Sequence, residues 1–267
     1  MRIVRGVDEV RAALAAPRRD GARIALVPTM GAYHDGHLAL FRLAAAECDV
    51  VVASLFVNPA QFGPGEDLAR YPRDEARDAE LAAGAGVALL FAPAPEAVYP
   101  PGFQTWVEVT ELGAALEGES RPGHFRGVAT VCLKLFNVVG PDVAYFGEKD
   151  AQQLAVVRQM VRDLDLPVEI RAVPTVRADD GLAQSSRNAY LSAAERARAL
   201  ALPRALAAGA EAHRRGEDPV AAARAVLGPI STDYVAVADF AGPRLLAAIH
   251  IGATRLIDNV ALTEDGT

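Results

Sequence analysis

The feature that most constrains the fold is a strand–turn–helix pattern in the stretch IALVPTMGAYHDGHLALF. The apolar run Ile24–Val27 predicts a buried strand, which breaks at Pro28 and turns through two glycines. Leu38, Phe41 and Ala45 then recur at helical spacing. A strand that leads through a Gly-rich turn into a helix directs backbone N–H groups and the positive end of the helix dipole to the carboxyl edge of a sheet. The pattern therefore predicts an α/β sheet with an anion-binding turn at its edge.

Two histidines, His34 and His37, lie in this turn. An imidazole there can donate a hydrogen bond to a phosphate oxygen and, when protonated, can neutralise developing charge. The alternative is that His37 only begins the helix, with Gly36 as a turn former. The strand, the Pro-Thr-Met-Gly turn and both histidines occur together, which favours the phosphate-binding interpretation.

Strands and helices alternate along the first two thirds of the chain. This alternation predicts a doubly wound, parallel α/β domain over residues 1–175. Expected strands are 49–57, 87–91, 105–109, 143–146 and 168–173, and expected helices are 71–83, 125–139 and 150–164.

The pattern changes near Pro174. The polar turn 176–181 is expected to be an inter-domain hinge, and residues 176–267 a small α+β domain. Its expected helices are 193–215 and 219–227, and its expected strands are 234–238, 248–251 and 254–257.

Composition excludes several classes of protein. The net charge of −7 over 267 residues gives no basic footprint, which argues against nucleic acid as the main partner. Cys48 and Cys132 are expected to be buried thiols without a metal or disulfide role. No apolar run has the length of a membrane span, and the start lacks the apolar region of a signal peptide. We therefore expect a soluble, cytoplasmic protein.

A second strand–glycine–helix pattern contains Gly147, Glu148, Lys149 and Asp150. Lys149 is a flexible point cation at a strand's carboxyl end, suited to a triphosphate. Asp150 could equally cap the following helix.

Three further polar segments each admit two interpretations. Ser185, Ser186 and Arg187 could clamp phosphate from a loop or form a polar hinge. Asp78 could hold Mg²⁺ or lie on a solvated helix face. The segment 121–127, RPGHFRG, fits an anion site or a helix cap. No P-loop signature and no nucleophilic triad is present in the sequence.

Five blocks together carry a resemblance: PTMGAYHDGH, FVNPAQF, RPGHFRGV, YFGEKDAQQL and DGLAQSSRNAYLS. In this order, over nearly the whole chain, they resemble the pantothenate synthetase family, the pantoate–β-alanine ligases among the nucleotidyltransferases with an HxGH motif. The resemblance implies a Rossmann-like N-terminal domain, a small C-terminal lid domain and a homodimer. It also implies ATP-dependent condensation of pantoate with β-alanine through a pantoyl adenylate, with Mg²⁺.

The resemblance assigns roles to positions of this chain. His37 would donate a proton. From the chemistry of the residues themselves, His34, Lys149 and Arg187 are expected to join it in neutralising charge on the phosphates. Gln61 would contact pantoate and then β-alanine, Gln153 would contact pantoate, and Asp78 would lie near Mg²⁺. The implied ATP-binding positions are Met30, Gly31, Ala32, Tyr33, His34, Asp35, Gly36, His37, Gly147, Glu148, Lys149, Asp150, Val176, Gln184, Ser185, Ser186 and Arg187.

Two positions depart from the family pattern. Many members have Leu at the position of Tyr33 and Met at that of Gln184, which bears on ATP affinity rather than on the reaction. Two rival hypotheses are a nucleotidyltransferase of the same superfamily with another acceptor, and a nucleotide-binding regulatory module without catalysis. The FVNPAQF and QQL blocks argue against the first, and the joint presence of both histidines, Lys149 and the Ser-Ser-Arg loop argues against the second.

Overall fold

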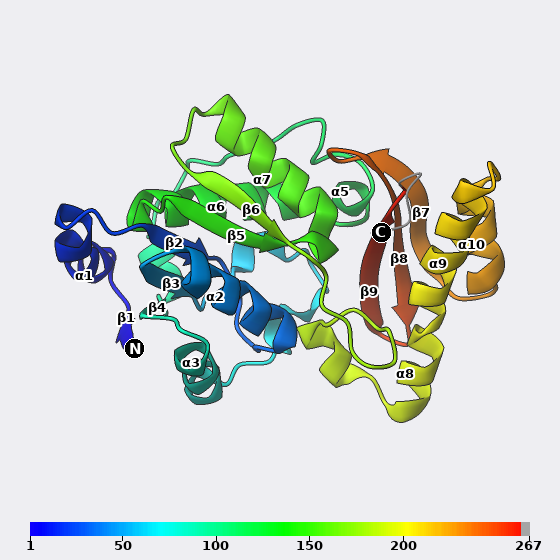
Figure 1. Ribbon diagram of the computed structural model, residues 1–267, viewed down its shortest axis with the longest axis horizontal. Helices are drawn as coiled ribbons and strands as arrows, with labels where there is room; N and C mark the ends of the chain where they lie inside the picture. Colours follow the sequence, from blue (N-terminus) through cyan, green and yellow to red (C-terminus); the bar gives the residue numbers. More distant parts are fainter. Residues whose placement is uncertain (263–267) are drawn as a thin grey trace. The chain divides into compact units, whose positions relative to one another are not determined.

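The computed structural model describes residues 1–262 (Figure 1). The chain forms two compact units. The first contains residues 1–147 and 156–173, and the second contains residues 148–155 and the chain from Pro174 on. The predicted division placed a single boundary after residue 175. In the structure the short segment after strand β5 groups with the second unit, and the boundary after residue 175 stays a prediction.

The first unit is built on a six-stranded parallel sheet in the order β1-β4-β3-β2-β5-β6. From β2 the chain builds outward through β3 and β4 on one side, and then through β5 and β6 on the other. The strand order therefore reverses between β2 and β5, which is where doubly wound sheets bind ligands. The strands are β1 (Arg2–Val4), β2 (Ile24–Val27), β3 (Val50–Ser54), β4 (Leu89–Phe91), β5 (Val143–Gly147) and β6 (Glu169–Val173). This topology confirms the predicted doubly wound parallel sheet.

Both faces of this sheet are buried. Ala25 and Val27 of β2 pack in one core cluster with residues of helices α2 and α3. Ile24 and Leu26 point to the opposite face and are also buried. Continuous apolar strands such as these are stable only when both faces are covered. The helices of this part of the chain are α1 (Val7–Arg19), α2 (Asp35–Glu47), α3 (Glu75–Gly84), α4 (Pro95–Val98), α5 (Glu117–Ser120), α6 (His124–Val139) and α7 (Ala151–Asp163), with short 3₁₀ turns η1 (Pro59–Gln61), η2 (Asp67–Ala69) and η3 (Glu148–Asp150).

The strand predicted at 105–109 is wrong, because this segment is irregular in the structure. The Val107 N–H donates to the Thr130 hydroxyl at 3.0 Å instead of joining a strand ladder. Trp106 is 43 % exposed and lies 5.0 Å from the Arg126 guanidinium, as a cation–π pair. Alternating apolar residues predict a strand only if a neighbouring strand supplies the pairing.

The second unit contains a three-stranded antiparallel sheet, β7-β8-β9, with helices packed on it. The predicted helix 193–215 is two helices, because Leu200 ends α8 and begins α9. Leu202 and Leu206 of α9 pack with Leu245 and Ile249 of β8 in one core. The elements are η4 (Ser186–Tyr190), α8 (Ala193–Ala199), α9 (Ala201–Arg214), α10 (Pro219–Leu227), β7 (Thr232–Asp239), β8 (Pro243–Ile251) and β9 (Thr254–Ala261). Across residues 1–262, every helix is too short or too polar to cross a membrane.

Candidate active site

The turn between β2 and α2 has a left-handed backbone. Gly31 and Ala32 have φ of +88° and +53°. A Cβ at Gly31 would lie 2.5 Å from Leu55 Cδ1 and 2.9 Å from an Asp78 oxygen, so both the conformation and the space require glycine there. Ala32 adopts a conformation that costs an L-residue about 1–3 kcal/mol unless its surroundings hold it.

Asp78 of α3 holds this turn. Its two carboxylate oxygens accept the backbone N–H groups of Ala32 and Tyr33, each at 2.7 Å, and the residue is 1 % exposed. Two successive N–H groups that converge on one anion form a nest, here filled by a side chain of the protein itself. Any contact of Ala32 or Tyr33 with ATP would therefore use other atoms than these N–H groups.

These contacts do not fit Asp78 as a Mg²⁺ ligand. Both of its oxygens face backbone donors, and the carboxylate is buried. The burial of Asp78 contradicts the solvated helix face that the sequence also allowed, while its place near Mg²⁺ stays a prediction.

The two histidines of the turn lie against each other, with ring centroids 4.2 Å apart. His34 caps α2, because its Nδ1 accepts the Gly36 N–H at 3.2 Å. His37 Nδ1 accepts the His34 N–H at 3.4 Å. A neutral imidazole whose Nδ1 accepts carries its proton on Nε2, so each ring is set as an Nε2–H donor.

Tyr33, the departure from the family pattern, fills the core beside these rings. It is 1 % exposed, its ring packs edge-on against Phe41 with centroids 5.0 Å apart, and the His37 ring lies 5.3 Å away. The Thr29 hydroxyl donates to the Tyr33 hydroxyl at 3.2 Å, and burial raises the pKa of Tyr33 well above its ordinary value. The buried Tyr33 ring therefore packs against the His37 ring from the side of the core.

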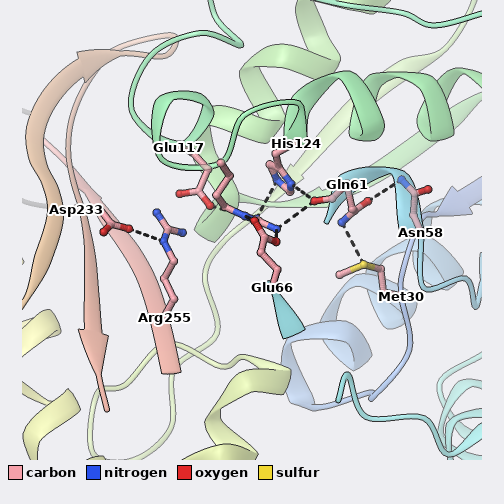
Figure 2. A network of polar contacts seen from close by, with 9 residues as sticks. Met30, Asn58, Gln61, Glu66, Glu117, His124, Asp233 and Arg255 are labelled. Atoms are coloured by element: carbon pink, nitrogen blue, oxygen red, sulfur yellow. Dashed lines mark hydrogen bonds and ion pairs between the residues drawn. The ribbon is translucent and has the colours of Figure 1, made fainter. Parts of the chain in front are cut away.

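Gln61 is held at both ends in the η1 turn after β3 (Figure 2). Its Nε2 donates to Met30 Sδ at 3.1 Å, which joins two predicted site residues. Its Oε1 accepts from Asn58 Nδ2 at 3.0 Å. Asn58 is 1 % exposed, and its Oδ1 accepts from the Ala60 N–H and the Tyr99 hydroxyl. Sequence reasoning missed Asn58 as a site residue, although an Asn before Pro at a turn start is a recognisable capping signal.

The carbonyl of Gln61 is fixed by the RPGHFRG segment. Arg121 Nη2 donates to it at 3.2 Å and His124 Nδ1 lies 2.9 Å from it. Arg121 also pairs with Glu66 at 2.6 Å and Glu117 at 3.3 Å, and these two carboxylates are labelled in Figure 2. Arginine has only donors, so His124 Nε2, 3.2 Å from Arg121 Nη1, must accept and Nδ1 must carry the proton. Burial, followed by the nearby Arg121 charge, lowers the pKa of His124 to about 4. The segment thus serves as a support for Gln61, an interpretation that the sequence did not suggest.

In the second unit, Lys149 lies in the η3 turn that directly follows β5. Its Nζ is 3.5 Å from Asp150 Oδ2, and its side chain is 18 % exposed. The turn begins one residue beyond Gly147, and β5 pairs in parallel with β2, so both turns leave the same edge of the parallel sheet. Gln153 lies in the first turn of the helix that follows, α7.

The remaining predicted residues gather around a closed turn. Gln184 N–H donates to the Val176 carbonyl at 2.9 Å, which places Val176 beside the loop of Ser185 to Arg187. Ser185 caps η4, because its Oγ accepts the Arg187 N–H at 3.3 Å. The segment that was expected to be a hinge forms a turn, which an antiparallel bridge between Arg177 and Ala183 closes. Gly181 within it has a φ of +87°.

A doubly wound sheet with an HxGH turn at its switch point, a glutamine held beside it and a lysine after the adjacent strand define an α/β enzyme of the nucleotide-dependent HxGH class. The chain belongs to one family of this class, since the family model "Pantoate-beta-alanine ligase" matches residues 2–261.

Named relatives agree over the full length. Pantothenate synthetase of Moorella thermoacetica is 53 % identical, with 98 % of this chain and 99 % of the relative covered. The crystal structure of pantothenate synthetase from Thermus thermophilus superimposes with a TM-score of 0.94 at 50 % identity, covering 98 % of this chain and 99 % of that one. Pantoate-beta-alanine ligase from Francisella tularensis, solved with Beta-gamma ATP and Beta-alanine, has a TM-score of 0.87 at 33 % identity and covers 98 % of both chains. The chain is accordingly a ligase that joins pantoate to β-alanine with ATP.

Proposed function

We propose that the residues described above carry out this ligation in two steps. In the first, a pantoate carboxylate oxygen attacks the α-phosphorus of ATP, the bond to the β-phosphate oxygen breaks, and pyrophosphate leaves. In the second, the amine of β-alanine attacks the pantoyl carbonyl, AMP leaves with the bonding electrons, and the amine loses a proton. Substitution of this kind depends mainly on positioning and on neutralising charge.

The observation that carries the proposal is that hydrogen bonds within the turn fix the orientation of two imidazole rings. His34 and His37 both use Nδ1 as an acceptor within the turn, so both offer Nε2–H donors at the N-terminus of α2. Donors that are fixed before the reaction stabilise charge that develops on phosphate oxygens. We assign His37 the role of proton donor and His34 that of a second donor beside it.

Lys149 and Arg187 supply the positive charge in this proposal. The sequence has only two lysines, Lys134 and Lys149, and uses arginine at every other basic position. Lys134 lies over the Phe103 ring, 4.8 Å from its centre. A flexible, compact cation directly after β5 in such an arginine-rich chain suits contact with phosphates that change position during the reaction.

We further propose that Gly31 and Gly36 allow close approach of the triphosphate, that Gly147, Glu148 and Asp150 shape the second ATP-binding turn, and that Gln61 and Gln153 hold pantoate. Mg²⁺ would enter as part of the nucleotide substrate, bound through phosphate oxygens. No step is assigned to a protein carboxylate that holds it.

The decisive experiment measures pyrophosphate release from purified protein with ATP, Mg²⁺ and pantoate, before and after addition of β-alanine. We expect a burst near enzyme stoichiometry, followed by steady turnover only with β-alanine. Release with a different acid or a phosphate ester, and none with pantoate, would instead support a nucleotidyltransferase with another acceptor. ATP binding without any pyrophosphate release would support a regulatory module.

Three further properties are part of the proposal: a homodimer, a cytoplasmic location and closure of the C-terminal unit during the reaction. Closure would exclude water from the hydrolysable adenylate. Sedimentation equilibrium tests the dimer, cell fractionation tests the location, and small-angle scattering with and without ATP and pantoate tests closure. Identical scattering curves in the two conditions would contradict closure.

A further inference from the structure

Asn259 of β9 uses every polar atom of its side chain within the second unit. The residue is 4 % exposed, and its Nδ2 donates to the carbonyl of Glu148 and to that of Lys149, both at 2.9 Å. Its Oδ1 accepts from Arg244 Nη1. Because arginine can only donate, this contact settles which end of the carboxamide is oxygen, and it directs the NH₂ group to the two carbonyls.

Arg244 contributes a second contact to the same turn. Its Nη2 donates to Glu148 Oε2 at 3.0 Å. Leu246 is the direct partner of Asn259 in the β8–β9 ladder, so Arg244, two residues before Leu246, is the diagonal neighbour of Asn259 on one face. The sheet thereby presents a matched pair of side chains to the segment 148–149.

The backbone from which the Asn259 side chain extends is also held in place, through Asp258. Asp258 accepts two hydrogen bonds from Arg177, at 2.6 and 3.1 Å, and its side chain is 1 % exposed. Asp258 Oδ1 accepts the Asn259 N–H at 2.8 Å as well. The backbone from which the Asn259 side chain extends is therefore restrained.

The two carbonyls that Asn259 binds belong to the two peptide groups flanking the Cα of Lys149. Fixing both peptide planes fixes φ and ψ of Lys149 and hence the origin and direction of its side chain. We propose that Asn259, oriented by Arg244, is a positioning residue for the Lys149 ammonium group. This inference rests on the proposed role of Lys149 and adds the residue that holds it in place, more than one hundred positions away in the sequence.

A double-mutant cycle separates positioning from a general effect on folding. We expect Asn259→Ala to slow pyrophosphate release from ATP and pantoate about 10- to 100-fold, since a displacement of a reacting group by about 1 Å has such an effect. In a Lys149→Ala background the same change should slow release less than about twofold. Asp239→Ala is the matched control, because it removes a side-chain contact to the Gly242 N–H in the same small sheet without touching the turn. It should leave release within about twofold of the parent.

The cycle also distinguishes the positioning role of Asn259 from the catalytic role proposed for Lys149. Equal losses for Asn259→Ala with and without Lys149 would overturn the positioning role while leaving Lys149 in the mechanism. Near-normal release by Lys149→Ala alone would remove Lys149 from the proposed function and the positioning role with it.

A spectroscopic test can decide whether Asn259 positions Lys149 even if Asn259→Ala lowers the stability of the protein. Reductive ¹³C-methylation labels Lys134, Lys149 and the N-terminal amine, since the sequence has no other lysine. In Asn259→Ser and Arg244→Met we expect the Lys149 methyl signal to shift and to lose its response to ATP. The Lys134 signal, over the Phe103 ring, should stay in place and report an intact fold. An unchanged Lys149 signal with an unchanged ATP response would overturn the proposal.

Discussion

Asp78 and Ala32 are joined by a hydrogen bond of 2.7 Å that ties helix α3 to the left-handed turn after β2. Asp78 also accepts the Tyr33 N–H, so its carboxylate takes the place of the water that would otherwise accept hydrogen bonds from these two N–H groups. The HxGH segment is thus shaped by a residue 46 positions further along the chain.

Asp78→Asn tests this relationship. The amide can accept with one atom only, so one buried N–H of the turn would lose its partner, and we expect a loss of about 2 kcal/mol in the free energy of unfolding. Urea denaturation measures the loss, and Glu80→Gln, on the exposed side of α3, is the control. The Mg²⁺ concentration that gives half-maximal activity should be unchanged, and a large rise in it would restore the metal role.

Gly31→Ala should be more harmful than a glycine substitution elsewhere. The substitution adds a Cβ to a residue with φ of +88°, and this Cβ would lie 2.5 Å from Leu55. We therefore expect the free energy of unfolding to fall by about 2–5 kcal/mol. Gly21 has φ of +77°, and a Cβ there would meet no atom within 4 Å, so Gly21→Ala isolates the conformational cost, about 1 kcal/mol. Equal losses in thermal unfolding would show that the contact with Leu55 is unimportant.

His37→Gln should slow adenylate formation about 10²- to 10⁴-fold, because the amide can still donate a hydrogen bond but cannot transfer a proton. Transfer of the pantoyl group from preformed pantoyl adenylate to β-alanine should remain close to normal. Single-turnover measurements of the two steps check this, with His213→Gln in α9 as the control. A defect confined to the β-alanine step would reverse the assignment.

His124 makes stability depend on pH in a defined range. Its pKa is lowered to about 4 in the folded protein, against an ordinary value of 6.5. The unfolded chain therefore binds the proton first as pH falls, so this contribution to stability is complete above pH 6.5 and is lost progressively down to about pH 4. The size is about 3 kcal/mol, since each pKa unit corresponds to about 1.4 kcal/mol. Urea unfolding between pH 7 and 4 should show a flatter profile in His124→Asn, while His213→Gln should follow the parent.

Lys149→Arg should not preserve activity. The planar guanidinium is bulkier and makes directional bonds, so we expect kcat/KM to fall about 100-fold, approaching the loss for Lys149→Ala. Lys134→Arg keeps a cation over the Phe103 ring and should stay within about twofold of the parent. Steady-state kinetics of the two variants, side by side, distinguish a specific requirement for lysine from a general one for positive charge.

Features set by neighbouring residues were predictable from the sequence. Ile24–Val27 is the β2 strand as expected, and Pro219–Leu227 is α10, because an apolar run and a Pro at a helix start are local signals. The alternation of strands and helices was enough for the doubly wound sheet. The pairing of His34 with His37 also follows from their spacing at the start of a helix.

Features that depend on distant contacts were not predictable. The interruption at Leu200 is a different case, because it has a local signal that the prediction overlooked: Pro203 lacks an N–H and its ring clashes with the carbonyl of Ala199, so one helix cannot run through this point. Cys48, expected to be buried, is only partly so, whereas Cys132 is buried and its pKa is raised to about 12 by loss of solvent. The support of Gln61 by Arg121 and His124 needs two segments about 60 residues apart to meet, and one sequence contains no measure of that.

The grouping of residues 148–155 with the C-terminal unit bears on how such a protein can be cut or recombined. A gene fragment for residues 176–267 would encode the small sheet without the turn that Arg244 and Asn259 bind, and would expose a buried carboxamide to water. Exchange of the C-terminal part between relatives at a single crossover would likewise combine Lys149 from one parent with Asn259 from the other. The C-terminal unit is therefore discontinuous in sequence, and a chimera that takes all of it from one parent needs two junctions, one on each side of the lysine turn, in addition to the one after β6.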